Sequence, residues 1–227
     1  GIWKLEQLGE LGLEKEQVRL LQMSFQVNYD VARKEYIDRG YWVDVDTGEI
    51  SCTYNYRPVK ALKYVKQEDS CFEVARIGRL YYYPGSGNRR VRWDAATFEP
   101  VTPEVLAAVK GHAQKEIRAA VKLAKNEMKN LLSEDYCGML LSFVRIGVIK
   151  TEQGNCWVLE DSTGERIELA VRDGWENSME AMSRIPQPEV LQNQALFGFL
   201  YYDREKRQIR MYPCSIVTDK GIVRLLY

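Results

Sequence analysis

Apolar residues near the start of the chain recur at steps of three and four. This spacing places them on one face of a helix. The positions concerned are Val18, Leu21, Phe25, Tyr29, Ala32 and Tyr36. The pattern predicts an N-terminal helix over residues 14–39. Gly40 follows it, and glycine is common just beyond a helix C-terminus.

From residue 41 the period changes to two. Tyr41, Val43 and Val45 fall on one face of a predicted strand, because successive side chains of a strand point to opposite faces. A turn at Thr47-Gly48 and a second strand beginning near Ile50 complete a predicted hairpin. A second hairpin is expected from strands at 72–83 and 89–93, joined by a glycine-rich turn.

The clearest helix signal begins at Thr102. Threonine caps helix N-termini, Pro103 suits the first helical position, and Glu104 favours the positive helix end. The pattern predicts a long helix over 102–134, with an interruption at Gly111. Its apolar seam is formed by Leu106, Val109, Ala113, Ile117, Val121, Ala124, Met128 and Leu131.

The remainder of the chain, 136–227, is again strand-like. Strands are predicted at 140–149, 155–159, 166–171, 195–202 and 208–217, with an edge strand at 222–226. A helical piece near Met179 follows the third strand. Five short strands with a helical connection after the third resemble the layout of an OB-fold, a partly open Greek-key barrel. No motif identifies a family.

Two segments of the sequence occur nearly twice, in the same order and 115 to 120 residues apart. Residues 42–50 are echoed by 157–167, and residues 78–93 are echoed by 198–211. Matching order and offset indicate one β-rich unit built twice. The expected fold is therefore α+β, with two OB-like or small-barrel units, an N-terminal helix and a long central helix. The expected domains are 1–100, a linking helix over 101–135, and 136–227.

Composition narrows the class of protein. The 227 residues are 45% hydrophobic, and 32 Lys and Arg balance 32 Asp and Glu. A globular chain without net charge has no global positive field, so any basic surface has to be local. No apolar run reaches the ~20 residues of a membrane-spanning helix. The five cysteines lack disulfide or zinc spacing, which favours reduced thiols and a cytoplasmic location.

Three basic clusters are the candidate functional features. The first is a stripe along the predicted central helix, with cations at alternating steps of three and four. Its members are Lys115, Arg118, Lys122, Lys125 and Lys129. The stripe spans ~21 Å of helix and could follow several phosphates. The alternative is an ordinary solvated helix flank, with Glu116 and Glu127 offsetting part of its charge.

The second cluster combines cations with tyrosines. Its members are Tyr54, Tyr56, Arg57, Lys60, Lys63 and Lys66. Single-stranded nucleic acids are bound by rings that stack on bases and by cations that hold phosphates. The alternative places the tyrosines inside the first unit and the lysines in solvent.

The third cluster is the tip of the second hairpin, where Arg90 and Arg92 share one strand face. The preceding glycine-rich turn lacks the Lys-Ser/Thr ending and the helix of a phosphate-binding loop. An exposed turn with solubilising arginines is the alternative.

Catalysis has little support. His112 is the only histidine, which argues against histidine triads and multi-histidine metal sites. Asp44 and Asp46 share a strand face and, with Glu49, could hold Mg²⁺ for a hydrolase. A strand running into a turn explains the same residues, so we expect no metal and no cofactor.

These observations favour a non-enzymatic module that binds single-stranded DNA or RNA through its first unit and central helix. The alternative is a protein–protein adaptor within a larger assembly, which the zero net charge favours. A metal-dependent hydrolase is the third reading.

Overall fold

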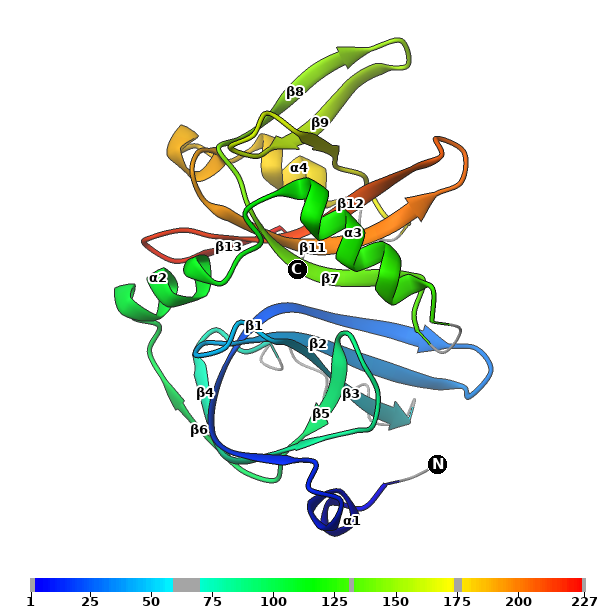
Figure 1. Cartoon of the computed structure of the whole chain (residues 1–227), viewed down its shortest axis with the longest axis vertical. Coiled ribbons are helices and arrows are strands. Elements are labelled where there is room, and N and C mark those ends of the chain that lie inside the picture. The colour runs from blue at the N-terminus through cyan, green and yellow to red at the C-terminus, as the bar shows by residue number, and fades with distance from the viewer. Residues whose placement is uncertain (1–2, 59–69, 131–132, 174–176, 226–227) are drawn as a thin grey trace. The chain divides into compact units, whose positions relative to one another are not determined.

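The computed structural model describes residues 3–58, 70–130, 133–173 and 177–225, and divides into two compact units, 1–102 and 103–227 (Figure 1). Both units are mostly β-sheet with few helices. The elements of unit 1 are α1 (Leu5–Glu10), β1 (Glu14–Asp30), β2 (Glu35–Asp44), β3 (Ile50–Pro58), β4 (Val74–Tyr82), β5 (Arg89–Arg92) and β6 (Ala96–Glu99).

The strands of unit 1 close into a ring. β1 pairs with β2 along its second half and with β4 along its first half, and β3 lies beside β2. β5 joins β3 in parallel and β4 in antiparallel orientation, so the order 1-2-3-5-4 returns to β1. This five-stranded ring is an OB-like Greek-key barrel.

The ring is filled by apolar side chains around Trp42. Trp42 packs edge-to-face on Trp93 with ring centroids 5.3 Å apart, and its Nε1 donates a hydrogen bond to Thr53 Oγ1 at 3.0 Å. Gly40 makes room for this indole, because a Cβ there would lie 2.8 Å from Trp42 Nε1. The other buried members of this core are Val18, Leu20, Ala75, Ile77, Leu80, Tyr82 and Val91.

The predicted N-terminal helix over 14–39 is wrong, because these residues form the β1–β2 hairpin. The turn is held by Asp30, whose Oδ1 accepts the N–H groups of Ala32 and Arg33 at 2.9 and 3.2 Å. Lys34 completes the turn with φ +54°. Cross-strand contacts, including Tyr29 on Tyr36 with centroids 5.0 Å apart, replace the contacts of the expected helix.

Unit 2 begins with two helices and continues with strands. Its elements are α2 (Pro103–Gly111), α3 (Ile117–Met128), β7 (Tyr136–Ser142), β8 (Arg145–Thr151), β9 (Gly154–Glu160), β10 (Arg166–Glu168), α4 (Asn177–Ser183), the 3₁₀ helix η3 (Pro188–Leu191), β11 (Ala195–Asp203), β12 (Gln208–Val217) and β13 (Ile222–Arg224).

The strands of unit 2 follow the same order as those of unit 1. β7 and β8 are successive halves of one path, in which β8 pairs with β9 and β7 pairs with β11. β10 lies beside β9, and β12 lies beside β11. A parallel bridge between Leu169 and Met211 joins the two sheets. α4 follows the third strand position, as the OB-like layout predicts.

The helix predicted over 102–134, with an interruption at Gly111, is two helices that are separated after that residue. The chain leaves the helix after Gly111, and Gln114 forms a parallel bridge with Leu141 before α3 starts. Asp161 fixes that start, because its Oδ2 accepts the N–H of Ile117 at 2.8 Å. Both helices lie within unit 2. The division into the three expected domains stays a prediction.

The first sequence echo corresponds to two similar turns. Asp44 Oδ1 accepts the N–H groups of Asp46 and Thr47, and Asp161 Oδ1 accepts those of Thr163 and Glu165. Each aspartate carbonyl also accepts the N–H of a glycine with positive φ, at positions 48 and 164. Duplication of the whole unit stays a prediction.

Candidate nucleic-acid interface

Arginines and tyrosines alternate across β2, β3 and β5 of unit 1. We call this set the arginine–tyrosine ladder, and its members are Arg33, Arg39, Tyr54, Tyr56, Tyr83 and Arg90. Arg33 Cζ lies 4.6 Å from the Tyr56 ring centroid, and Arg39 Cζ lies 4.9 Å from that of Tyr54. Arg90 Cζ lies 5.5 Å from the Tyr54 ring and 4.4 Å from the Tyr83 ring.

Strand register places the ladder outside the barrel. Tyr54 lies opposite Arg39 on β2, and Tyr56 is two residues further along β3, so their side chains share one face. Thr53 lies on the other face, where its hydroxyl contacts the Trp42 indole of the core. The ladder therefore covers the outer face of the β2–β3–β5 sheet. The β1–β2 turn contributes Arg33, and Tyr83 begins the β4–β5 loop.

Part of the ladder is open to solvent and uncompensated in charge. Tyr56 is 38% exposed, and Arg33 is also exposed. Neither Arg33 nor Arg90 pairs with a carboxylate of the residues that the structure describes. Arg90 Nη2 instead donates to the Tyr54 carbonyl at 3.5 Å. The guanidinium groups of Arg33 and Arg90 therefore each lie over a tyrosine ring. Because no carboxylate of the described residues pairs with them, their positive charge is available to a ligand.

The second predicted cluster is only partly described. Tyr54 and Tyr56 lie on the ladder. Arg57 points to the opposite face, where its guanidinium forms an ion pair with Asp38, a carboxylate that is only 1% exposed. That pairing offsets the charge of Arg57. The predicted Lys60, Lys63 and Lys66 lie outside the described residues.

The two arginines of the third predicted cluster lie in different surroundings. Arg90 contacts two tyrosines of the ladder, whereas Arg92 is exposed and lies opposite Tyr81 in the β4–β5 pair. Neighbouring Arg89 lies over the Tyr82 ring at 4.3 Å and pairs with Glu49 at 3.4 Å.

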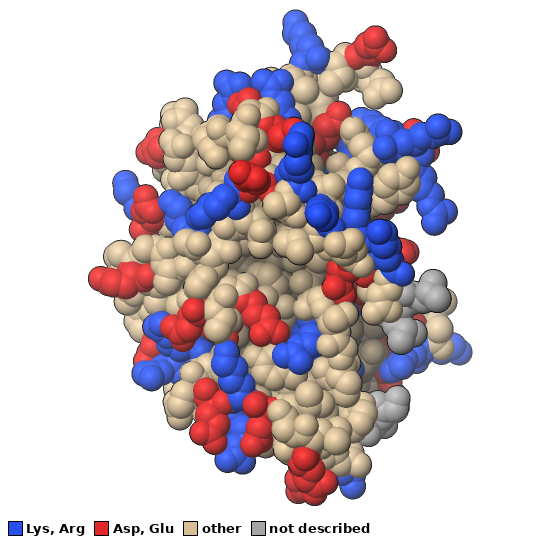
Figure 2. All heavy atoms as spheres, in the orientation of Figure 1, with Lys and Arg blue, Asp and Glu red and all other residues tan. Residues whose placement is uncertain are grey.

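The predicted basic stripe surrounds α3, although not all of it is helical. Lys115 precedes the helix and Lys129 is its C-terminal cap residue. All five cations are exposed, and Figure 2 shows Lys and Arg side chains gathered over α3. Among them Arg118 pairs with Glu165 at 3.3 Å. Ile117 and Ala124 of the predicted apolar seam are buried, together with Ala120, which lies outside that seam.

The corresponding strands of unit 2 carry a neutralised cluster. Arg210 lies opposite Tyr201 in the β11–β12 pair, as Arg92 lies opposite Tyr81 in unit 1. Its guanidinium contacts Glu168 at 3.1 Å and Asp203 at 3.2 Å. Burial raises the pKa of the Tyr201 hydroxyl, which Arg210 also contacts. This surface offers far less free positive charge than the ladder.

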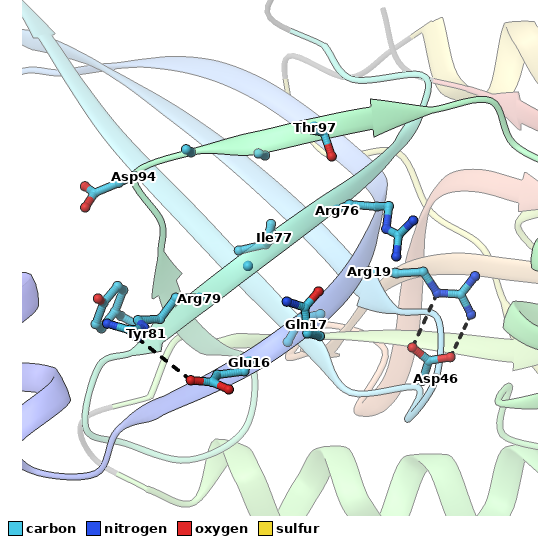
Figure 3. Close-up of a pocket in the computed structure, with 14 residues that line it drawn as sticks. Glu16, Gln17, Arg19, Asp46, Arg76, Ile77, Arg79, Tyr81, Asp94 and Thr97 are labelled. Carbon is cyan, nitrogen blue, oxygen red and sulfur yellow. Dashed lines mark hydrogen bonds and ion pairs between the residues drawn. The ribbon is translucent and has the colours of Figure 1, made fainter.

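Unit 1 also contains a polar groove of about 940 Å³ between β1, β4 and β6 (Figure 3). Arg19 is held by Asp46 at 2.7 Å, and Arg76 by Glu99 at the same distance. At the other end Arg79 lies near Glu16 at 3.8 Å (Figure 3). Each arginine of the groove therefore has a nearby carboxylate.

The residues considered for catalysis lie in turns, ion pairs and connections that support the fold. Asp44 is buried in its turn, and Asp46 is paired with Arg19. His112 lies in the short connection after α2. No group of three or more His, Cys, Asp or Glu side chains in the described ranges could hold a metal ion. No described helix is long and apolar enough to cross a membrane.

Sequence reasoning missed three members of the ladder: Arg33, Arg39 and Tyr83. The helix predicted over 14–39 contains Arg33 and Arg39, and a helix does not place them beside the tyrosines of β3. The signal was present in Asp30, a residue type common in turns, and in the charged run Arg33-Lys34-Glu35 that follows shortly after it. Tyr83 follows the strand that leads into the glycine-rich loop.

No protein-family model matches the chain, and no curated protein matches it in sequence. Among solved structures it is similar to the Ifi202 HINa domain in complex with 20-bp double-stranded DNA, with TM-score 0.38, 11% identity and coverage of 88% of this chain and 90% of that one. A murine DNA-binding protein bound to double-stranded DNA gives TM-score 0.35, 8% identity and coverage of 87% and 94%.

A replication protein A heterotrimer bound to single-stranded DNA gives TM-score 0.27 at 9% identity, covering 95% of this chain and 68% of that chain. TM-scores this low do not establish a shared fold. The OB-like description of each unit therefore rests on its own strand pairing.

Proposed function

We propose that unit 1 binds single-stranded nucleic acid across the arginine–tyrosine ladder. The observation that carries this proposal is the alternation of cations and rings on one sheet face, where Arg33 and Tyr56 are exposed and the other four members are half-buried. Aromatic rings stack on bases of any sequence, and guanidinium planes can also stack while they contact phosphates. OB-folds use the face of strands 2 and 3, with the flanking loops, for oligonucleotides.

The spacing of the rings suits successive bases of an extended strand. Tyr54 and Tyr56 are two residues apart on β3, which separates their Cα atoms by ~6.6 Å. That is about twice the 3.4 Å rise per nucleotide of one strand in a stacked duplex. A ligand that uses both rings would therefore have to unstack, which favours a single strand over a duplex.

We propose separately that the basic stripe on unit 2 makes phosphate contacts of its own. Its cations are exposed and, apart from Arg118, form no ion pair with a carboxylate of the described residues. They would add affinity that depends on salt and not on base identity. The protein acts as a binding module and not as an enzyme.

Fluorescence anisotropy with labelled DNA and RNA tests the proposal. Single strands of about 20 nucleotides exceed the 4–16 nucleotides of one OB-fold site. Wild type should bind with a steep salt slope. Tyr56→Ala should weaken binding by about 5- to 150-fold, equivalent to ~1–3 kcal/mol, with the slope unchanged. Arg90→Ala should reduce the slope by about 1.

Arg76→Ala is the matched control, because Arg76 is an exposed arginine of the same unit that pairs with Glu99 and lies off the ladder. It should bind like wild type. Absence of binding even at low salt would remove the nucleic-acid proposal and leave the second candidate, a protein–protein adaptor. The zero net charge of the chain favours that candidate.

A further inference from the structure

Residues 25–29 of β1 form a strand edge without a strand partner in the described part of the chain. Residues 14–21 of β1 pair with β4 on one side, and residues 20–30 pair with β2 on the other. Over residues 25–29, the side of β1 that faces β4 in the first half of the strand has no strand partner among the described residues. Alternate backbone N–H and C=O groups along this edge therefore point away from the sheet.

This edge lacks the features that protect sheet edges. Residues 20–29 (Leu-Leu-Gln-Met-Ser-Phe-Gln-Val-Asn-Tyr) contain no charge, no proline and no glycine. Natural proteins block exposed edges with charged residues, prolines or short strands. β3 shows such protection, because past its contact with β5 it ends in Arg57-Pro58. β6 and β13 are protected by their lengths of four and three residues.

The exposed part of the edge is chemically self-complementary about Val27. Phe25 and Tyr29 flank Val27 on one face, and Gln26 and Asn28 flank it on the other. Reading this segment in either direction gives the same order: aromatic, amide, Val27, amide, aromatic. Val27 is 38% exposed and Tyr29 is 47% exposed.

We propose that this edge pairs with the same edge of a second copy of the chain, antiparallel and centred on Val27. Phe25 of each copy then lies opposite Tyr29 of the other, and Gln26 lies opposite Asn28. Aromatic pairs directly across antiparallel strands stabilise a sheet, and a twofold interface needs such a self-complementary patch.

The pairing would join the two β1–β2–β3 sheets into one continuous sheet. Residues directly opposite each other in an antiparallel pair lie on the same face. Gln26 is opposite Arg39 on β2, so it lies on the ladder face, and Asn28 lies on that face too. Both ladders would therefore face the same side, and the dimer would offer two single-strand sites.

Sedimentation velocity over a range of protein concentrations, without nucleic acid, tests the dimer. Wild type should shift from monomer to dimer as concentration rises. Val27→Lys places two ammonium groups opposite each other on the twofold axis and should sediment as monomer. Val27→Glu alone should do the same. An equimolar mixture of the two variants should recover the dimer, because opposite charges then meet across the axis.

Val31→Lys is the control, since Val31 is 78% exposed in the turn beyond the strand, and this variant should dimerise like wild type. The proposal is overturned if wild type stays monomeric throughout, if Val31→Lys also loses the dimer, or if the mixed variants fail to associate. The dimer does not depend on nucleic-acid binding, so each proposal can fail while the other stands. Only the paired binding sites rest on the proposed function.

Discussion

Asp161 is a single side chain that joins three parts of unit 2. It is 2% exposed, and its carboxylate accepts the N–H groups of Ile117, Thr163 and Glu165 and the Thr163 hydroxyl. The turn after β9 is thereby tied to the first residue of α3. Burial acts to raise the pKa of Asp161, but these hydrogen bonds outweigh it and hold the pKa below its ordinary value.

Asp161→Ala should destabilise unit 2 by at least about 2 to 3 kcal/mol, because several hydrogen bonds to a charged group are lost together. The depressed pKa also implies a pH dependence. The stabilisation that Asp161 contributes to unit 2 is complete at pH values above the pKa of Asp161 in the unfolded chain. It is lost as the pH falls toward the lower pKa that Asp161 has in the folded protein. Urea unfolding at neutral and acidic pH would measure both effects.

Ser162→Ala in the same exposed turn should leave stability unchanged and is the control. If Asp161→Ala loses equal stability at neutral and acidic pH, the ionised carboxylate is not the stabilising form.

Individual site residues were predictable where the local strand assignment was correct. Tyr54 and Tyr56 were proposed because they lie beside a basic cluster in the sequence, and Arg90 because of its face on a predicted strand; in the structure Arg90 lies beside Tyr54. Arg33 and Arg39 were missed for the opposite reason. Cation–ring contacts between strands depend on register, and register cannot be read from residues assigned to a helix.

At the level of elements, β1 shows why two periodicities can be confused. Between residues 18 and 36, apolar residues three or four positions apart form the face of a helix. The same segment also has an apolar residue at every second position, as in a strand: Leu21, Met23, Phe25, Val27 and Tyr29. The bulge between Gln22 and Ser24 shifts the alternation partway along the strand. The two other hairpins of unit 1 were predicted correctly because their turns contain glycine at positive φ, at Gly48, Gly85 and Gly87.

The stripe on α3 can be tested as an element. Lys122→Ala and Lys125→Ala together should reduce the salt slope of nucleic-acid binding by about 2, since each phosphate contact contributes about 1. Alanine has high helix propensity, so circular dichroism should show an intact helix.

Arg118→Ala should change the slope less, because Arg118 is already paired with Glu165. An unchanged slope in the lysine double variant would show that the stripe is a solvated flank with no ligand contact.

At the level of the whole molecule, thiol reactivity reports on both units together. Cys52, Cys137, Cys156 and Cys214 are buried, and Cys71 is half-buried. Burial raises the pKa of Cys137 to about 11, and burial also raises that of Cys156. A buried thiol with a raised pKa is a poor nucleophile because little thiolate forms.

Alkylation of the native protein should therefore modify Cys71 first, and all five cysteines should react in urea. Mass spectrometry of the labelled peptides measures the order. Cys71→Ser should remove the fast reaction. Rapid labelling of Cys137 or Cys214 in the folded protein would contradict the burial described for them.

The layout of the strands was more predictable than the strand pairings that close each ring. Strand positions in 136–227 gave the OB-like layout, because each strand has its own pattern and turn. The ring closures could not be predicted, since they depend on contacts between segments far apart, such as Leu169 with Met211.

Closure of the unit 1 ring has a consequence for the order of folding. The β1–β2 hairpin joins neighbouring segments, so it can form quickly and early. The β1–β4 pairing instead brings Glu14 to Tyr81, and the β3–β5 pairing brings Ser51 to Arg89. Such distant pairings carry a loop-closure entropy cost before they are stabilising, which slows folding. The core around Trp42 is complete only after these late pairings, so a nascent chain that has not yet reached β5 exposes its indole to solvent.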